Sequence, residues 1–133
     1  MENRINKWNL FLEDVRDLET THQYMRNSDY LLKEWVIVRN FREFVEALKS
    51  HSELPDLISY DHDLADEHYD VSMYHGVPQY SQVAENFREK TGLDCVRYLI
   101  QEYLEPRKIR HPDYLIHSMN PVGKIRISQE IRD

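Results

Sequence analysis

The stretch LISYDHDL, at positions 57–64, decides the fold. Its first four residues are mainly apolar, as in a buried strand of a parallel sheet. The strand then runs directly into Asp61, His62 and Asp63, so its carboxyl end carries two carboxylates and an imidazole. In open α/β sheets, ligands bind outside the carboxyl ends of the strands. We therefore expect this edge of the sheet to hold the functional site.

Two other apolar stretches end in the same way. One covers residues 8–13 and leads into an acidic pair, and the other covers residues 114–118. Both are predicted to be strands. Together they bring to the same edge Glu13, Asp14, His117 and Ser118.

The remaining pattern alternates strands with helices. A β-branched run predicts another strand over 34–39. Helical spacing of apolar residues predicts helices over 41–49, 91–105 and 121–131, the second of them ended by Pro106. The polar stretch 16–33 has weak periodicity, and we interpret it as mostly loop with one short helix. This order of elements predicts an α/β fold with a mainly parallel four-stranded sheet, built by right-handed crossovers. The expected strand order is 2-1-3-4. It would place Asp61 between the tips of the first and fourth strands.

Length and composition restrict the class of protein. The 133 residues suit a single domain, 1–133, with a candidate lid in the irregular segment 65–90. A formal charge of −7 and a pI near 5.5 argue against a broad nucleic-acid or membrane surface. The single cysteine, Cys95, is expected to be a buried thiol in a reducing compartment. Since we find no signal peptide or membrane span in the sequence, we expect a cytoplasmic protein.

The carboxylates at the predicted edge indicate a metal site. Glu13, Asp14 and Asp61 would repel one another unless a cation or shared protons offset their charge. Mg²⁺, which prefers oxygen ligands, is the natural cation for such a set. The alternative for each residue taken alone is a solvated acid at a strand end or a helix cap.

Two histidines and a serine supply what the carboxylates lack. His62 and His117 could divide the work of general base and general acid, because the unperturbed imidazole pKa lies close to neutral pH. Ser118 could donate a hydrogen bond to a phosphate oxygen or act as a nucleophile. Adjacent strand residues point to opposite faces, however, so His62 need not share the direction of Asp61, and either His117 or Ser118 would only brace the site.

Several groups near the same edge could bind an anion. The last predicted helix begins at Asn120 and Pro121, where the side chain of Asn120 can act as the cap and backbone N–H groups are free. Arg16 and Arg39 lie just beyond two strand tips and could contact phosphate oxygens. Lys124 could approach from the helix. The alternative for each cation is a surface charge that pairs with the many acids.

Four motifs carry a resemblance to a known family. In chain order they are LFLEDVR at 10–16, ISYDHDL at 58–64, TGLDC at 91–95 and HSMNPVG at 117–123. They resemble the cyclic-phosphate processing receiver-like family, which is related to the receiver domains of two-component signalling. The resemblance spans nearly the whole chain. It implies a receiver-like (flavodoxin-like) three-layer sandwich and a role on cyclic phosphates, for instance at RNA ends.

Two departures from the related patterns qualify this resemblance. The first acidic position, usually Asp in the family, is Glu13, which lengthens the ligand by one methylene. The chain also stops too soon after the fourth strand to add the fifth strand of a receiver, with its Lys. Asp61 nevertheless matches the receiver phosphoacceptor.

These observations lead to a main hypothesis and alternatives. The main one is a metal-assisted phosphoesterase that opens a cyclic phosphate on a nucleotide or RNA terminus, with Mg²⁺ as cofactor. The alternatives are a non-catalytic receiver-like module that binds a phosphorylated or nucleotide ligand and signals through a protein partner, or a phospho-Asp receiver. A structural or host-interaction protein whose acidic edge has no chemistry stays as a further alternative.

Overall fold

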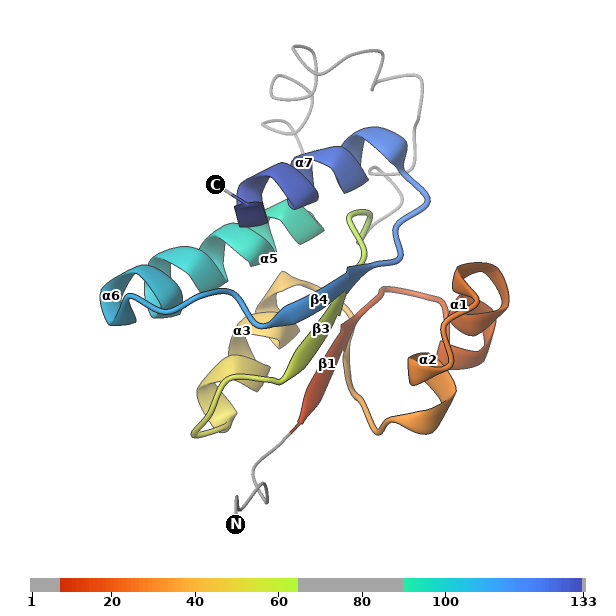
Figure 1. Ribbon diagram of the computed structural model, residues 1–133, viewed down its shortest axis with the longest axis horizontal. Helices are drawn as coiled ribbons and strands as arrows, with labels where there is room; N and C mark the ends of the chain where they lie inside the picture. Colours follow the sequence, from red (N-terminus) through yellow and green to blue (C-terminus); the bar gives the residue numbers. More distant parts are fainter. Residues whose placement is uncertain (1–7, 65–89, 133) are drawn as a thin grey trace.

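A parallel four-stranded sheet forms the centre of the molecule, as the sequence predicts (Figure 1). The computed structural model describes residues 8–64 and 90–132. The predicted lid therefore lies almost wholly outside the described residues. All three strand pairings are parallel, and the predicted order is confirmed. Along the sheet the strands are β2 (Val36–Val38), β1 (Asn9–Leu12), β3 (Leu57–Tyr60) and β4 (Asp113–Ile116).

The prediction for the stretch between β1 and β2 is wrong, because it forms two helices, α1 (Leu18–Met25) and α2 (Asp29–Leu32). The Asp17 side chain caps α1 by accepting a hydrogen bond from the Thr20 backbone N–H at 2.8 Å. The helix buries only Thr21, which explains the weak apolar periodicity. The α1 helix is therefore stabilised by its cap and by tertiary contacts rather than by an apolar face, whereas α2 has no side-chain cap and buries Tyr30.

The other predicted helices are present. The first is α3 (Phe41–Ser50) and the last is α7 (Pro121–Arg132). Between them lies one long helix, which runs from α5 (Gly92–Leu99) through the π-helical segment η3 (Ile100–Leu104) to α6 (Glu105–Arg107). Pro106 does not itself end the long helix, because the helix continues through it to Arg107. The helix ends where Lys108 turns to a φ of 56°.

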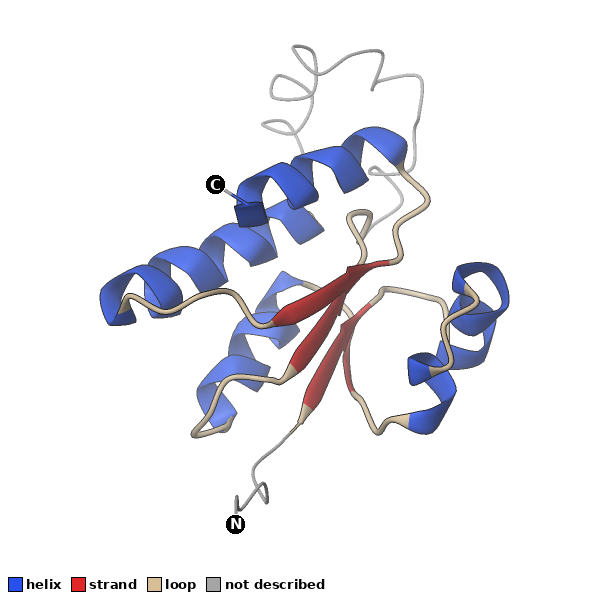
Figure 2. Cartoon of the chain, in the orientation of Figure 1, coloured by secondary structure: helices blue, strands red, loops and turns tan. Residues whose placement is uncertain are grey.

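The two faces of the sheet are covered by different helices, which gives the three layers (Figure 2). Leu10 and Ile58 belong to the main apolar core, together with residues of α3, α5 and α7. On the opposite face, the Phe11 ring contacts the Tyr30 ring of α2 at a centroid distance of 6.1 Å. The same face carries Ser59, whose hydroxyl is hydrogen-bonded to that of Tyr30.

Strand alternation extends past the carboxyl ends of the strands and decides where the polar side chains point. The backbone N–H of Asp61 bonds to the carbonyl of Leu12 at 3.1 Å, and that of His117 bonds to the carbonyl of Tyr60 at 2.9 Å. Glu13 follows Phe11 by two residues, as Asp61 follows Ser59. These side chains therefore gather on the face covered by α1 and α2.

Candidate functional site

Three buried polar residues form a cluster at the carboxyl edge of the sheet. Glu13, Asp61 and His117 each offer one ligand atom, and these atoms all lie within 4.8 Å of one another. Their exposed fractions are 0%, 1% and 0%. Two carboxylates and an imidazole removed from water in this way form the kind of group that can hold a metal ion.

Glu13 is held as an anion. Its Oε2 accepts a hydrogen bond from the Arg16 backbone N–H at 3.0 Å, and its Oε1 lies 3.1 Å from Nε2 of His117. Burial raises the pKa of this carboxyl, but the hydrogen bonds from His117 and Arg16 outweigh burial and lower the pKa from 4.5 to about 2. Glu13 is therefore ionised throughout the neutral pH range.

Asp61 is in the opposite situation. Its Oδ2 is buried and has no hydrogen-bond partner among the described residues. Burial, together with the negative charges of Glu13 and Asp63, raises the pKa of Asp61 from 3.8 to about 8. A buried carboxylate oxygen without a partner is costly, so this oxygen is expected to bind a proton, a cation or an ordered water molecule.

His117 connects the cluster to the interior of the protein. Its ring stacks on Phe11, with centroids 4.8 Å apart, and its Nδ1 lies 2.7 Å from the Ser59 hydroxyl oxygen. Ser59 is in turn 2.7 Å from the Tyr30 hydroxyl. Burial lowers the pKa of His117, although the hydrogen bond with Glu13 opposes the change. The imidazole is therefore neutral at pH 7.

The chain of contacts from Tyr30 through Ser59 to His117 was not predicted from the sequence. Ser59 is a polar residue inside an apolar strand, and this was the signal available. Its partner Tyr30 lies in the polar stretch 16–33, whose weak periodicity predicts mostly loop. No short-range pattern links the two residues, which are 29 positions apart.

Arg16 places a positive charge beside the cluster, as predicted. Its Nη1 lies 3.5 Å from Oε1 of Glu13, and its Nη2 lies 3.4 Å from the sulfur of Met119. The guanidinium also lies over the Tyr24 ring, 5.6 Å from the centroid. The Arg16 side chain is 22% exposed, so it connects the buried carboxylate to the surface.

Arg39 has a different position from the one expected for a phosphate ligand. Its Nη1 donates hydrogen bonds to the backbone carbonyls of Glu13 and Arg16, at 3.0 Å and 3.2 Å. These bonds fix the loop that follows β1. The geometry therefore supports a role for Arg39 in holding Glu13 and Arg16 in place.

His62 points to the other face of the sheet, so the structure does not pair it with His117. Its ring lies against Gly123 of α7, where an added Cβ would be 2.4 Å from Cγ of His62. Its Nδ1 is 2.8 Å from Oδ1 of Asp63, which also accepts a hydrogen bond from Nδ2 of Asn120 at 3.0 Å. These contacts attach the end of β3 to the start of α7.

The other predicted site residues lie around the two groups. Asn120 caps α7, as predicted, by accepting a hydrogen bond from the Gly123 N–H at 2.9 Å. The Ser118 hydroxyl oxygen accepts one from the Asn120 N–H at 3.1 Å, and Lys124 is exposed in the first turn of α7. Asp14 is half-buried and lies outside the cluster, although its charge contributes to the raised pKa of Asp61. The functional roles of these residues stay predictions.

The sheet order and the acidic residues that follow β1 and β3 define a receiver-like domain. A sequence profile for the family described as the cyclic-phosphate processing receiver domain matches residues 8–133. The chain belongs to this family. No match was found among curated proteins or solved structures. Within the described ranges, no helix is both long and apolar enough to span a bilayer.

Proposed function

We propose that the protein hydrolyses a cyclic phosphodiester on a nucleotide or RNA end, at the cluster of Glu13, Asp61 and His117 and with a divalent cation. The observation that carries this proposal is the buried Oδ2 of Asp61, which lies beside the ionised Glu13 and has no hydrogen-bond partner in the part of the chain that the structure describes. The family's association with cyclic-phosphate processing supports the substrate class. The buried thiol of Cys95, the single cysteine of the sequence, is in keeping with work in the cytoplasm.

The residues present fit a cation. Glu13 and Asp61 would hold it through carboxylate oxygens, the ligands that Mg²⁺ accepts, and Asp14 is close enough to add its charge. A bound divalent ion would neutralise charge that develops on the phosphoryl oxygens. The raised pKa of Asp61 supports this fit, because burial and the charges of Glu13 and Asp63 outweigh the lowering by the positive charge of Arg16.

The chain's own groups would bind and orient the phosphate. The Arg16 guanidinium lies beside the cluster and is partly exposed, so it can reach a phosphate oxygen while it stays near Glu13. In the proposed reaction a water oxygen bonds to phosphorus, a ring P–O bond breaks, and the departing alkoxide takes a proton to give the monoester. Nε2 of His117 meets Glu13 at the cluster, where it can either move a proton or serve as a ligand.

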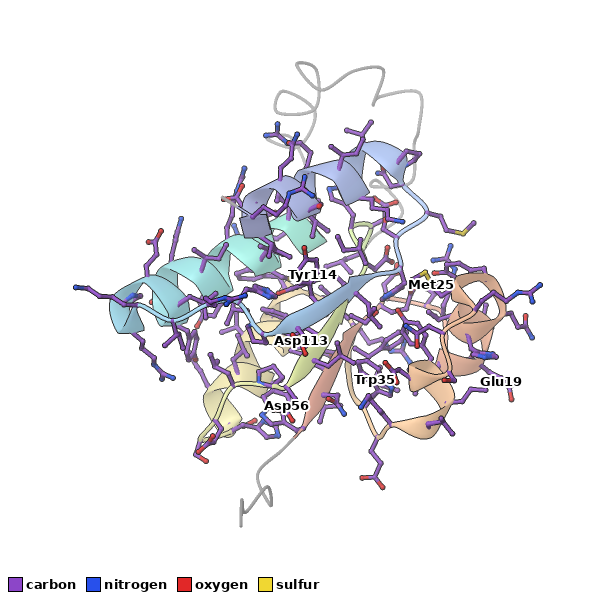
Figure 3. All side chains as sticks on the ribbon, in the orientation of Figure 1. Glu19, Met25, Trp35, Asp56, Asp113 and Tyr114 are labelled. Carbon is purple, nitrogen blue, oxygen red and sulfur yellow. The ribbon has the colours of Figure 1, made fainter. Side chains whose placement is uncertain are left out.

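The test is to incubate the purified full chain with 2′,3′- and 3′,5′-cyclic nucleotides and a divalent cation, and to measure monoester release. Asp61→Asn is expected to lower turnover by about a hundredfold, since it removes a carboxylate ligand of the cation that would stabilise charge on the phosphoryl oxygens. Asp56→Asn is the matched control, because Asp56 lies at the amino end of β3, away from the site (Figure 3). Equal turnover by Asp61→Asn and wild type would refute the proposal.

A non-catalytic receiver-like module is the second candidate. It is favoured by the position of Asp61, which follows β3 where receivers carry their phosphoacceptor. Calorimetry that detects binding of a cyclic nucleotide without any monoester product would support this module, which would then signal through a protein partner. A mass increase of one phosphoryl group at Asp61 after treatment with acetyl phosphate would indicate a phospho-Asp receiver.

A further inference from the structure

We infer that His117 is itself a ligand of the cation, so that the site takes a transition-metal ion such as Zn²⁺, Fe²⁺ or Co²⁺ in preference to Mg²⁺. The inference rests on the proposed function only in placing a cation at the cluster of Glu13, Asp61 and His117. It assigns the imidazole to metal binding rather than to proton transfer, and it adds two residues, Ser59 and Tyr30, that hold the imidazole in position.

The spacing of the ligand atoms is the first observation. Nε2 of His117 lies 3.1 Å from Oε1 of Glu13. Two ligand atoms that bind one ion at about 2.1 Å, at roughly a right angle, are about 3 Å apart. Asp61 supplies a third atom within 4.8 Å of both, and its buried Oδ2 has no partner in the described part of the chain. The Glu13 and His117 atoms are therefore spaced like neighbouring ligands of one ion, and the Asp61 carboxylate lies beside them.

The chemistry of the ligands selects the ion. Mg²⁺ prefers oxygen ligands and gives up its water reluctantly. An imidazole nitrogen favours zinc, iron, cobalt or nickel, and the affinity of such sites generally rises along the first transition row. A site made of one imidazole and two carboxylates in a buried pocket is therefore expected to bind Zn²⁺ or Co²⁺ more tightly than Mg²⁺.

The environment of the His117 ring supports a ligand role. A metal ion needs the lone pair on Nε2, so the ring proton must then sit on Nδ1 and be donated to a neighbour. Nδ1 faces the Ser59 hydroxyl at 2.7 Å, and this oxygen can accept that proton.

The same hydroxyl also serves the metal-free protein. There Nε2–H donates to Glu13, so Nδ1 must accept a hydrogen bond from Ser59. A hydroxyl can reverse its role in this way, whereas a carbonyl in its place would fix one tautomer. The Tyr30 hydroxyl, 2.7 Å behind Ser59, can reverse with it. Ser59 and Tyr30 are therefore positioning residues that allow His117 to serve both states.

The experiment uses no substrate, so its outcome is separate from that of the hydrolysis assay. The full chain is treated with EDTA, and binding of Zn²⁺ and of Mg²⁺ is measured by calorimetry and by thermal shift. Zn²⁺ is expected to bind at least about tenfold more tightly than Mg²⁺, with one tight site. His117→Gln is expected to lose this preference while it keeps weak Mg²⁺ binding. Co²⁺ gives a matching signature, a visible absorption band whose position changes in His117→Gln.

The positioning role has its own matched pair of variants. Tyr30→Phe is expected to weaken Zn²⁺ binding by about tenfold and to shift the Co²⁺ band, because the chain behind Nδ1 is shortened. Tyr24→Phe also removes a phenolic hydroxyl that contacts His117. That hydroxyl donates to the backbone carbonyl of His117, at 2.5 Å, and not to its ring. This control is expected to leave both readings unchanged.

Two results would overturn the inference: Mg²⁺ binding as tightly as Zn²⁺ in wild type, or unchanged Zn²⁺ binding in His117→Gln. If His117→Gln does not fold, as judged by circular dichroism, ¹⁵N spectra of the labelled wild type decide. A shift of the Nε2 resonance of His117 on addition of Zn²⁺ supports a ligand, and an unchanged resonance excludes it. Intact metal selectivity without turnover would refute the proposed hydrolysis alone.

Discussion

Replacing Asp61 by asparagine is expected to stabilise the metal-free protein at neutral and alkaline pH. The folded-state pKa of Asp61 is raised from 3.8 to about 8, first by burial and then by the negative charge of Glu13. A raised pKa means that the protonated form is favoured in the folded state. The stability that this proton contributes is complete below pH 4 and is lost as the pH rises through 8. Asparagine has the same shape and does not ionise, so it avoids this loss.

The expected size follows from the linkage between protonation and folding. Between pH 7 and pH 8 the folded carboxyl goes from mostly protonated to half protonated, while the unfolded one is fully ionised. The wild-type free energy of unfolding should therefore fall by about 1 kcal/mol over this interval, and that of Asp61→Asn should stay constant. At pH 8 the variant should be more stable by at least about 2 kcal/mol, which corresponds to a Tm higher by roughly 6 °C or more.

The assay is thermal or urea unfolding in EDTA at pH 7 and pH 8. This window is chosen because Glu13, with a pKa of about 2, is ionised in both states there. Asp14→Asn is the control, since it removes a neighbouring half-buried charge and should keep most of the wild-type slope. The same slope in wild type and Asp61→Asn would refute the reasoning, because the titrating group would then lie elsewhere.

Three other substitutions test the surroundings of the site by urea unfolding. Glu13→Gln should destabilise the protein by about 2 kcal/mol at pH 7, because the folded-state pKa of Glu13 is lowered from 4.5 to about 2. A lowered pKa contributes stability that is present above pH 4.5 and is lost as the pH falls through 2. The difference in stability between wild type and variant should therefore shrink at about pH 3, and an unchanged difference there would contradict this prediction. Gly123→Ala should lower the free energy of unfolding by about 1–3 kcal/mol, since the new Cβ would lie 2.4 Å from Cγ of His62. Alanine has the higher helix propensity, so a gain in stability would show that the His62 ring does not pack against this position. Asn120→Ala should cost about 1–2 kcal/mol through loss of the α7 cap and of the bond to Asp63, whereas Asn120→Ser, which keeps a cap, should cost less.

Much of the fold could be predicted because its signals are local. Apolar runs that end in polar residues mark the strands, and strand–helix alternation restricts the topology to a few parallel arrangements. The cap at Asn120 was also readable from the sequence, and its side chain accepts the expected backbone N–H. The helices α1 and α2 were not readable, because α1 buries a single threonine and α2 has only four residues.

The direction of each site residue required the three-dimensional structure. Alternation along a strand predicts that Asp61 and His62 point to opposite faces, but it does not say which face carries the site. That choice depends on Gly123 of α7, which leaves room for the His62 ring, and on Ser59, which binds the His117 ring on the other face. Both contacts join segments more than 50 positions apart, so no local pattern reveals them.

The burial of Asp61 also bears on the choice between holding a cation and accepting a phosphoryl group. Without a bound cation the side chain, with a pKa of about 8, is largely protonated at neutral pH, and a protonated carboxyl is a poor nucleophile. Either role therefore needs a cation to make Asp61 an anion. Phosphoacceptance also needs the oxygen to reach a phosphodonor, whereas only 1% of the residue is exposed. Holding a cation needs only an oxygen that faces Glu13 and His117, and this is the arrangement present.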